Sequence, residues 1–537
     1  MSANRTLKHD FYGSTVKKHN RVGYGVGGRT RVPARWVPYE VWSNPNIPCL
    51  IVHPGIEGDR GMSAIDWAIK EQPETWGVTV MQADQEMDAG NIWSTMDFSI
   101  DRPNINTLTK SSLYSNEVTD AAVHNCLQAV DNFINGVKPK PLDYSQSHVQ
   151  GGLQPNMTKD DRRVDWEQPM EDVARILRMS DSAPGSIAQF RLSGNVPVWS
   201  DEMRVFGAHL EEEKLRDVKG VPGEIVGQRD NAVLVKCGKG AVWISHVKRK
   251  KLKLPATFWL PNIKPNQLRN PVVEVQHKTF PRTFQEIWTT VCPKGICTVN
   301  FEFYNGAMNT IQCKRLEAVL KNVEMDERIK VIVLKGGYNF FSNGIHLNVI
   351  ESAKDPAQES WSNINAINDV VKRVFMSKKV TVSALQGNAG AGGAMMALAS
   401  DIALSREGVI LNPHYHTMHL HGSEYHSYLL PLRVGKDMAH ELLYSNIPLL
   451  STEAVRIGFL NDSSGKTHQE FDNFVDDFTK ELSRPSMIKE YKNKKTKKQR
   501  DEWFEKAEEH KRKELFIMAM NFHDDKYHQS RKAFVFH

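Results

Sequence analysis

The chain has 537 residues, of which 40% are hydrophobic and 25% charged, and its formal net charge is +6. This length exceeds what one hydrophobic core supports, so we expect a soluble α/β protein of several domains. The absence of an 18-residue apolar run argues against a membrane span, the first 30 residues lack the apolar core of a secretory signal, and the mild charge does not indicate nucleic acid. The six cysteines form no CxxC pair, which predicts no metal site and a reducing, cytoplasmic compartment.

The N-terminal elements alternate in type. Residues 1–35 are basic and Gly-rich, and we predict a disordered leader, with an organellar transit peptide as the alternative. A strand is expected within 47–56, a helix over 62–72, a strand over 76–82 and a helix over 116–137. Pro139 and Pro141 end this unit, which predicts a first domain over 36–150 followed by a polar linker.

The rest of the chain predicts two further domains and a tail. A helix near 169–179 and short strands around 186–191, 203–208, 222–228, 231–237 and 240–247 indicate a small β-barrel over 155–265. A second linker is expected over 248–270. Alternating strands and helices then predict an α/β domain over 271–470, and residues 471–537 form a charged helical tail. The basic run 492–500 is interpreted as a solvated helix face.

His53 and Asp88 are the candidate acid–base pair of the first domain. His53 follows a buried strand, and Asp88 follows the next strand, 35 residues on. A carboxylate in one cleft with an imidazole can orient the ring and hold its proton. A lone histidine would more often be a core residue bonded to the backbone, so the interpretation depends on the motifs around it.

Those motifs are His53-Pro-Gly, Arg60-Gly61, Gly77-Val-Thr and Asp88-Ala-Gly90, in this order. The series resembles the 10-formyltetrahydrofolate-dependent formyltransferases. The resemblance implies that His53 and Asp88 face the formyl group and that 10-formyltetrahydrofolate is the donor substrate. It places the folate-contacting positions at Ile51, Gly55, Arg60 and Gln82.

The first domain departs from that family in two ways. The catalytic Asn of the family falls at Ile51, which cannot donate a hydrogen bond. Only about 50 residues precede His53, so the first strand–helix portion of the family's nucleotide fold has no counterpart. Three explanations stay open: residues 1–35 substitute for it, the domain is impaired, or the sequence starts too late. Loss of a central strand would expose its apolar neighbours.

Two strand-to-loop corners mark the third domain. Strand 331–335 leads to Phe341-Ser-Asn-Gly344-Ile345, and strand 380–385 leads to a glycine cluster and a helix of small residues from Ala394 to Ser400. Backbone N–H groups at two such corners can hold a developing oxyanion. The pair resembles the crotonase (enoyl-CoA hydratase/isomerase) superfamily, which binds acyl-CoA thioesters. The resemblance implies N–H donors at Ile345 and Gly392 and coenzyme A contacts at Gly344, Gly390 and Gly393.

The acid–base residues of crotonase-fold hydratases are absent. Their two glutamates correspond to Met395 and His414, so hydration is disfavoured. His414, Tyr415 and Glu424 are instead the candidates to move a proton beside the thioester, and a glutamate in a partly apolar cleft has a raised pKa. The plain alternative for each is a surface or supporting hydrogen bond.

The fusion of both modules resembles the HypX (HoxX) hydrogenase-maturation proteins. That resemblance rests further on Phe301-Glu-Phe-Tyr-Asn-Gly-Ala-Met308, Asn412-Pro-His-Tyr415 and Gly422-Ser-Glu-Tyr425. It implies formyl transfer from 10-formyltetrahydrofolate to coenzyme A, decarbonylation of formyl-CoA to carbon monoxide, and hydrogenase maturation machinery as a partner. Two alternatives stay open: an acyl-CoA lyase or thioesterase with a vestigial first module, and a non-catalytic acyl-CoA-binding protein.

Overall fold

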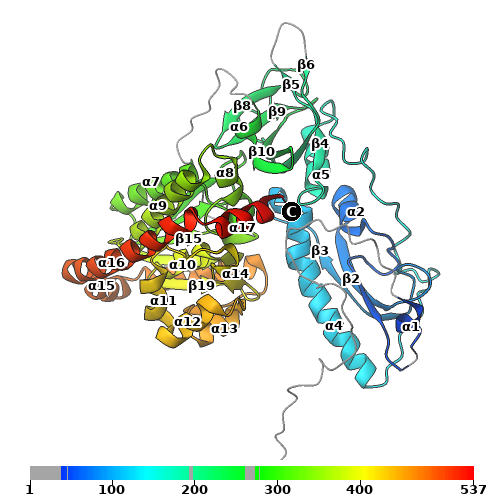
Figure 1. The fold of residues 1–537 in the computed structure, drawn as a ribbon. Coiled ribbons are helices and arrows are strands. Elements are labelled where there is room, and N and C mark those ends of the chain that lie inside the picture. The colour runs from blue at the N-terminus through cyan, green and yellow to red at the C-terminus, as the bar shows by residue number, and fades with distance from the viewer. Residues whose placement is uncertain (1–37, 45, 193–197, 261–272, 277–278, 537) are drawn as a thin grey trace, which may run out of the picture. The chain divides into compact units, whose positions relative to one another are not determined.

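The computed structural model describes residues 38–44, 46–192, 198–260, 273–276 and 279–536 (Figure 1). The predicted leader, residues 1–35, lies outside this part. The described residues belong to one compact unit. Among them, no helix combines the length and the apolar composition that crossing a membrane requires.

A three-stranded sheet forms the centre of the first domain. Its order is β1-β2-β3, with both pairs antiparallel. The strands are β1 (Leu50–His53), β2 (Thr75–Gln82) and β3 (Ile92–Ser99), and the helices are α1 (Tyr39–Trp42), α2 (Ala64–Glu71), α3 (Lys110–Leu113) and α4 (Thr119–Ile134). Two short turns precede α4, the 3-10 helix η1 (Ile105–Thr107) and the π-helix η2 (Tyr114–Val118). The predicted helix over 116–137 is therefore shorter, because η2 interrupts its first turn.

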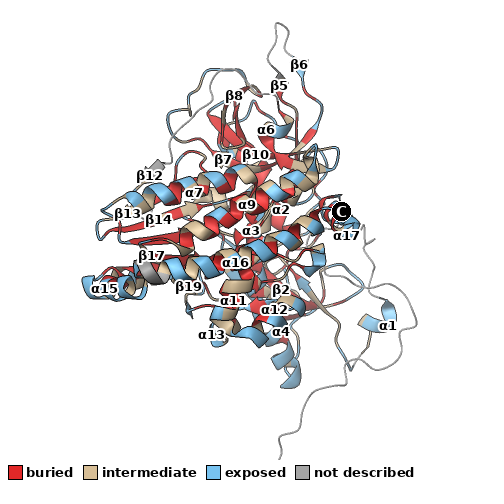
Figure 2. Cartoon of the chain, turned by 60° about the vertical axis from the view of Figure 1, so that its left-hand side comes forward, coloured by how far each residue is buried: buried red, intermediate tan, exposed pale blue. Residues whose placement is uncertain are grey.

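The outward face of α4 is apolar. Val123, Leu127, Val130 and Ile134 follow one another at helical spacing, and all four are exposed (Figure 2). Val52 on β1 is also exposed, and β1 is an edge strand. Apolar surface of this kind is normally covered, but among the described residues nothing covers the outward face of α4 or the edge at Val52.

The second domain is an open sheet. Its path is β4-β7-β10-β9-β8, and β11 pairs with β10. The strands are β4 (Ser186–Ala188), β7 (Met203–Leu210), β8 (Ile225–Arg229), β9 (Ala232–Lys236), β10 (Ala241–Arg249) and β11 (Leu252–Pro255), with helices α5 (Met170–Met179) and α6 (Ala256–Trp259) and a small ribbon of β5 (Arg191–Leu192) and β6 (Val198–Trp199).

Two predictions for this region are corrected. The strands lie where the sequence places them, but within the described residues no ladder joins β4 to β8. Only an isolated bridge from Arg191 to Glu224 links the chain after β4 to the residue before β8, so the predicted barrel is not closed. The stretch 248–270, predicted to be a linker, contains β11 and α6.

Two sheets form the third domain. The larger has the order β12-β13-β14-β15-β17-β19-β22, parallel except between β13 and β14, and the smaller has the order β16-β18-β20-β21. The strands are β12 (Val273–Val275), β13 (Ile287–Cys292), β14 (Ile296–Phe301), β15 (Val331–Lys335), β16 (Phe340–Ser342), β17 (Val380–Leu385), β18 (Asn388–Gly390), β19 (Ile402–Ser405), β20 (Ile410–Asn412), β21 (Leu449–Leu450) and β22 (Asp462–Ser463).

Helices alternate with these strands, as the sequence predicts. They are α7 (Thr310–Met325), α8 (Leu347–Ser352), α9 (Pro356–Phe375), α10 (Gly392–Leu398), α11 (His426–Val434), α12 (Lys436–Tyr444) and α13 (Ser451–Arg456), with the short turns η3 (Tyr304–Gly306) and η4 (His416–Met418). The chain is thus an α/β protein, with an antiparallel sheet in its first domain and mainly parallel sheets in its third.

The predicted tail is helical, but it is part of the third domain's core. Its helices are α14 (His468–Leu482), α15 (Pro485–Lys494), α16 (Lys497–Phe522) and α17 (Asp525–Phe536). Met518, Phe522 and Tyr527 are buried in the main core cluster, and the buried Arg531 pairs with Glu351 at 2.7 Å. α16 contacts α9 and α11. The tail helices therefore bury one face although their sequence is highly charged.

Replacing one buried aromatic residue of α16 tests this packing. Phe522 is 1% exposed and Phe516, on the same helix, is 69% exposed. We expect Phe522→Ala to lower the free energy of unfolding by about 3–5 kcal/mol, because it leaves a cavity in the core. The urea midpoint measures this, and Phe516→Ala is the matched control. Equal midpoints for the two variants would contradict the packing.

Two candidate active sites

His53 stands between two carboxylates. Its Nε2 lies 2.7 Å from Oδ2 of Asp59, and its Nδ1 lies 3.6 Å from Oδ2 of Asp88. His53 and Asp59 are buried at the end of β1 and in the loop that follows it. An imidazole with an acidic oxygen at each nitrogen can pass a proton from one side to the other. The sequence predicted the pair with Asp88 and missed Asp59, although Asp59 directly precedes the Arg60-Gly61 motif.

Backbone contacts hold the two loops of this site together. The N–H of Gly61 donates to Asp88 Oδ2 at 3.1 Å, and Arg60 donates from Nε to the carbonyl of Met87 at 3.0 Å. A Cβ on Gly55 would collide with the Asp59 carboxylate and the His53 ring. Arg60 and Gly55, predicted to contact folate, thus brace the loops in this structure.

Ile51 and Gln82 lie on the two paired strands behind the histidine. Ile51 is two residues before His53, so both side chains lie on the same face of β1. Gln82 ends β2 and pairs with Leu50. Both are half-buried. The register therefore places Ile51 on the face of His53, whereas Gln82 shares the opposite face with Leu50.

The second site is built where two backbone corners meet. β16 pairs with β18, and α10 begins two residues after β18. Gly344 has φ +76°, and a Cβ built on it would lie 3.3 Å from the N of Gly392. A Cβ on Gly393 would collide with the carbonyl oxygen of Ser342, and one on Gly390 would lie 2.9 Å from Asn343 Oδ1. The approach requires residues without side chains.

The predicted oxyanion donors are free at this junction. Gly392 is the first residue of α10, where a helix has no internal partner for its N–H groups. Within the described part of the chain, neither the Ile345 nor the Gly392 N–H donates to a protein acceptor. Two unsatisfied N–H groups on adjacent corners can polarise a carbonyl oxygen.

Glu424 lies directly against this junction. A Cβ on Gly392 would collide with its carboxylate. Tyr415 donates its hydroxyl to Glu424 Oε2 at 3.0 Å. Burial raises the pKa of Glu424 to about 7, against the effect of the Tyr415 hydrogen bond. Burial and the neighbouring Glu424 raise the pKa of Tyr415 well above its usual value. A glutamate of this kind can give or take a proton near neutral pH.

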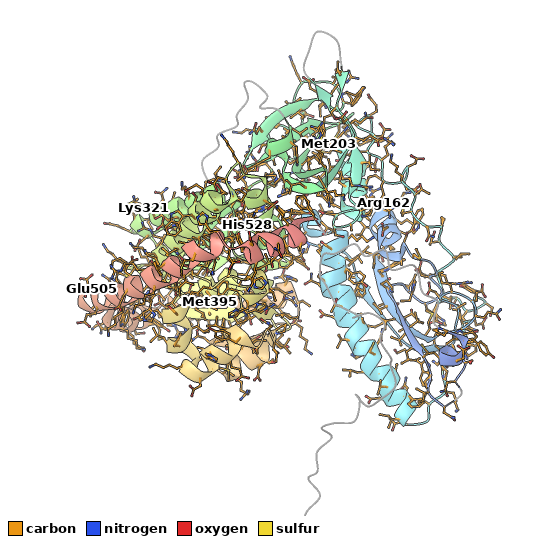
Figure 3. The ribbon with its side chains drawn as sticks, in the orientation of Figure 1. Arg162, Met203, Lys321, Met395, Glu505 and His528 are labelled. Atoms are coloured by element: carbon orange, nitrogen blue, oxygen red, sulfur yellow. The ribbon has the colours of Figure 1, made fainter. Side chains whose placement is uncertain are left out.

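The positions of the hydratase glutamates carry no carboxylate. Met395 is fully buried on α10 (Figure 3). His414 is half-buried, burial lowers its pKa, and its Nδ1 has no hydrogen-bond partner within the described residues. The described contacts bring Tyr415, and not His414, to Glu424.

A cavity of about 140 Å³ lies beside the second site. Its walls come from all three domains and include Asn104, His209, Tyr304 and Phe340. Tyr304 donates to Asp181 at 2.7 Å across two of these domains. Its wall residue Asn305 accepts a hydrogen bond from Asn343, next to Gly344. Ile345 and Gly392 themselves do not line this cavity.

Comparisons with known proteins match both modules. Family models match residues 34–128 (formyl transferase), 156–262 (formyl transferase, C-terminal domain) and 292–535 (enoyl-CoA hydratase/isomerase). The hydrogenase maturation factor HoxX of Bradyrhizobium diazoefficiens is 34% identical over 517 residues, which are 93% of this chain and 84% of that protein. The chain belongs to the HoxX/HypX family of hydrogenase maturation factors.

Solved structures of this family agree over nearly the whole chain. A crystal structure of a HypX variant from Aquifex aeolicus has a TM-score of 0.84 at 39% identity, covering 94% of this chain and 89% of that one. HypX from the same organism in complex with tetrahydrofolic acid also has a TM-score of 0.84 at 39% identity, with 93% and 86% covered. A methionyl-tRNA formyltransferase of Streptococcus equi subsp. equi is 27% identical over 208 residues, 38% of this chain and 59% of that protein.

A methyl group at the junction of the second site tests its close approach. We expect Gly393→Ala to lower the free energy of unfolding by about 1–3 kcal/mol, because its Cβ collides with the backbone of Ser342. Gly152→Ala is the matched control, since a Cβ there meets no atom within 4 Å. Denaturant unfolding measures both. A Gly393→Ala protein as stable as the Gly152→Ala protein would contradict the junction.

Proposed function

We propose that this chain transfers a formyl group from 10-formyltetrahydrofolate to the thiol of coenzyme A and then decarbonylates formyl-CoA. The carbon monoxide serves the iron centre of a [NiFe]-hydrogenase. The observation that carries the proposal is Glu424, buried against Gly392 beside two unpaired N–H groups and bonded to Tyr415.

The first module supports the transfer step. HypX of Aquifex aeolicus was crystallised with tetrahydrofolic acid, which indicates a folate site in the family. His53, held between Asp59 and Asp88, takes the thiol proton as sulfur attacks the formyl carbon. The C–N bond to the folate breaks, its nitrogen is protonated, and formyl-CoA and tetrahydrofolate are the products.

The second module supports the decarbonylation step. The N–H groups of Ile345 and Gly392 polarise the formyl C=O. The C–S bond breaks with its electron pair remaining on sulfur, and the formyl proton passes through the Glu424–Tyr415 pair to that sulfur. Formyl-CoA thus yields carbon monoxide and coenzyme A with no oxidant or reductant. Gly344, Gly390 and Gly393 let the two corners approach closely, which places both N–H donors on the same carbonyl oxygen.

A vestigial first module is the second candidate. The exposed apolar stripe on α4 and the edge position of β1 favour it, because a domain with uncovered apolar surface would lose formyl transfer first. The chain would then act on supplied formyl-CoA alone. The two candidates differ in one measurement, carbon monoxide formed from the folate donor.

Crossed variants separate the two steps. Purified protein with 10-formyltetrahydrofolate and coenzyme A should release carbon monoxide that a haem trap detects. We expect His53→Ala to lose this activity and to keep release from supplied formyl-CoA. Tyr415→Phe and Glu424→Gln should accumulate formyl-CoA instead. Gly392→Pro removes one oxyanion N–H and also places a Cβ against the Glu424 carboxylate, so it should slow release by at least about 100–1000-fold.

Three outcomes decide between the candidates. Release from formyl-CoA but not from the folate donor favours the vestigial module. The proposal is contradicted if wild-type protein releases no more carbon monoxide than Gly392→Pro from either substrate. Tight coenzyme A binding in calorimetry without turnover of any thioester would instead indicate an acyl-CoA-binding protein.

Asp59→Asn tests the carboxylate that the sequence did not single out. We expect formyl-CoA formation to fall about 100-fold, since an amide cannot accept the proton that His53 carries. Release of carbon monoxide from supplied formyl-CoA should stay unchanged. Asp101→Asn, at an exposed position, is the control. Unchanged formyl transfer in Asp59→Asn would show that Asp88 alone is sufficient.

A further inference from the structure

The turn that carries Glu424 has a backbone conformation that needs support. Glu424 has φ +60° and Tyr425 has φ +59°, and neither is glycine. Consecutive side-chain-bearing residues in this region are disfavoured and persist only where their surroundings fix them. A strained turn directly beside a reactive site indicates that its geometry matters.

Glu514 of the tail helix α16 accepts hydrogen bonds from this turn and from Ser427, which follows it. Its Oε2 accepts the N–H of Tyr425 at 3.1 Å and the hydroxyl of Ser423 at 3.3 Å. Its Oε1 accepts the N–H of Ser427 at 2.8 Å and the hydroxyl of Ser427 at 2.6 Å. Glu514 is 1% exposed. A buried carboxylate is costly unless it is bonded in this way.

The same contacts cap a helix. Tyr425 is the N-cap residue of α11, and Ser427 lies in the first turn. These N–H groups have no partner within their own helix, and the N-terminus favours a negative charge. Glu514 supplies both the acceptors and the charge, although it lies almost 90 residues along the chain.

Asn368 of α9 also holds the turn. Its Oδ1 accepts the N–H of Glu424 at 2.8 Å, and its Nδ2 donates to Ser423 Oγ at 2.9 Å. The turn is therefore clamped between α9 and α16. We propose that Glu514 is a positioning residue, which fixes the 423–425 turn so that the Glu424 carboxylate is aimed at Gly392. This inference rests on the proposed function.

The charge of Glu514 also acts on Glu424. After burial and the Tyr415 hydrogen bond, Glu514 is the next influence on the pKa of Glu424, and it raises it. Other ionisable groups near the two carboxylates are Tyr415, Cys313, His421, His426 and His510. Loss of the Glu514 charge therefore favours ionised Glu424, and its pKa falls from about 7 toward the usual range.

Glu514→Gln tests the inference, because the amide keeps one acceptor oxygen and places an NH2 group where one of the two backbone donors, Tyr425 or Ser427, needs an acceptor. The first readout is difference infrared titration of the Glu424 carboxyl band, which Glu424→Gln identifies by its absence. We expect the band to titrate at lower pH in Glu514→Gln. The second readout is release from formyl-CoA, where kcat should fall about 100-fold with little change in KM, since the reacting group is misplaced.

Two further variants keep the test decisive. Glu509→Gln alters an exposed glutamate of the same helix, paired with Lys513, and should leave both readouts unchanged. Ser427→Ala replaces Glu514→Gln as the test if the latter does not fold. It keeps the Glu514 charge and removes one contact, so we expect a smaller loss in kcat and an unchanged titration of the Glu424 carboxyl. Failure of wild-type protein to release carbon monoxide would overturn the proposed function, whereas the infrared titration would still report on Glu514. Identical Glu424 titration and kcat in folded Glu514→Gln and wild type would overturn the positioning role.

Discussion

The contact between two backbone corners is the constraint on which the third domain depends. Gly344 and Gly392 approach so closely that a side chain on either would separate them or displace Glu424. Two parallel strands deliver the chain to this point, and a helix begins there. In the proposed reaction, the unpaired N–H groups of Ile345 and Gly392 polarise the carbonyl without any titratable group, and the acid–base residues move the proton.

Both sites follow one physical design, a titratable group held in a buried setting by a partner that is itself fixed. His53 is held between Asp59 and Asp88, and Glu424 between Tyr415 and the Gly392 corner. Burial raises the pKa of Glu424, and the carboxylates beside His53 lie close to both of its ring nitrogens. The proposed route divides the formation of carbon monoxide from 10-formyltetrahydrofolate between these two sites, and formyl-CoA is the intermediate that links them.

The sequence predicted the parts of the structure that short-range pattern controls. β15 and β17 begin and end at the predicted residues, because each is a continuous apolar run between turn residues. Tyr415 and Glu424 were predicted near the thioester, and they are bonded to each other. Asn368 and Glu514 were given no role, because their partners lie on other elements. Asp59 was missed although its partner His53 lies only six residues earlier in the chain. A single buried glutamate in a highly charged helix has no local signature. Whether β4 pairs with β8 to close the sheet of the second domain cannot be predicted from the spacing of strands along the chain.

The central claim is that the Ile345 and Gly392 amides bind a thioester oxygen. Isotope-edited difference infrared spectroscopy of acetyl-CoA, labelled at the thioester carbonyl and bound to the protein, measures that contact most directly. The account predicts a carbonyl band at lower frequency than in water, and a smaller shift in Gly392→Pro. A bound carbonyl with the same frequency as free acetyl-CoA would contradict it.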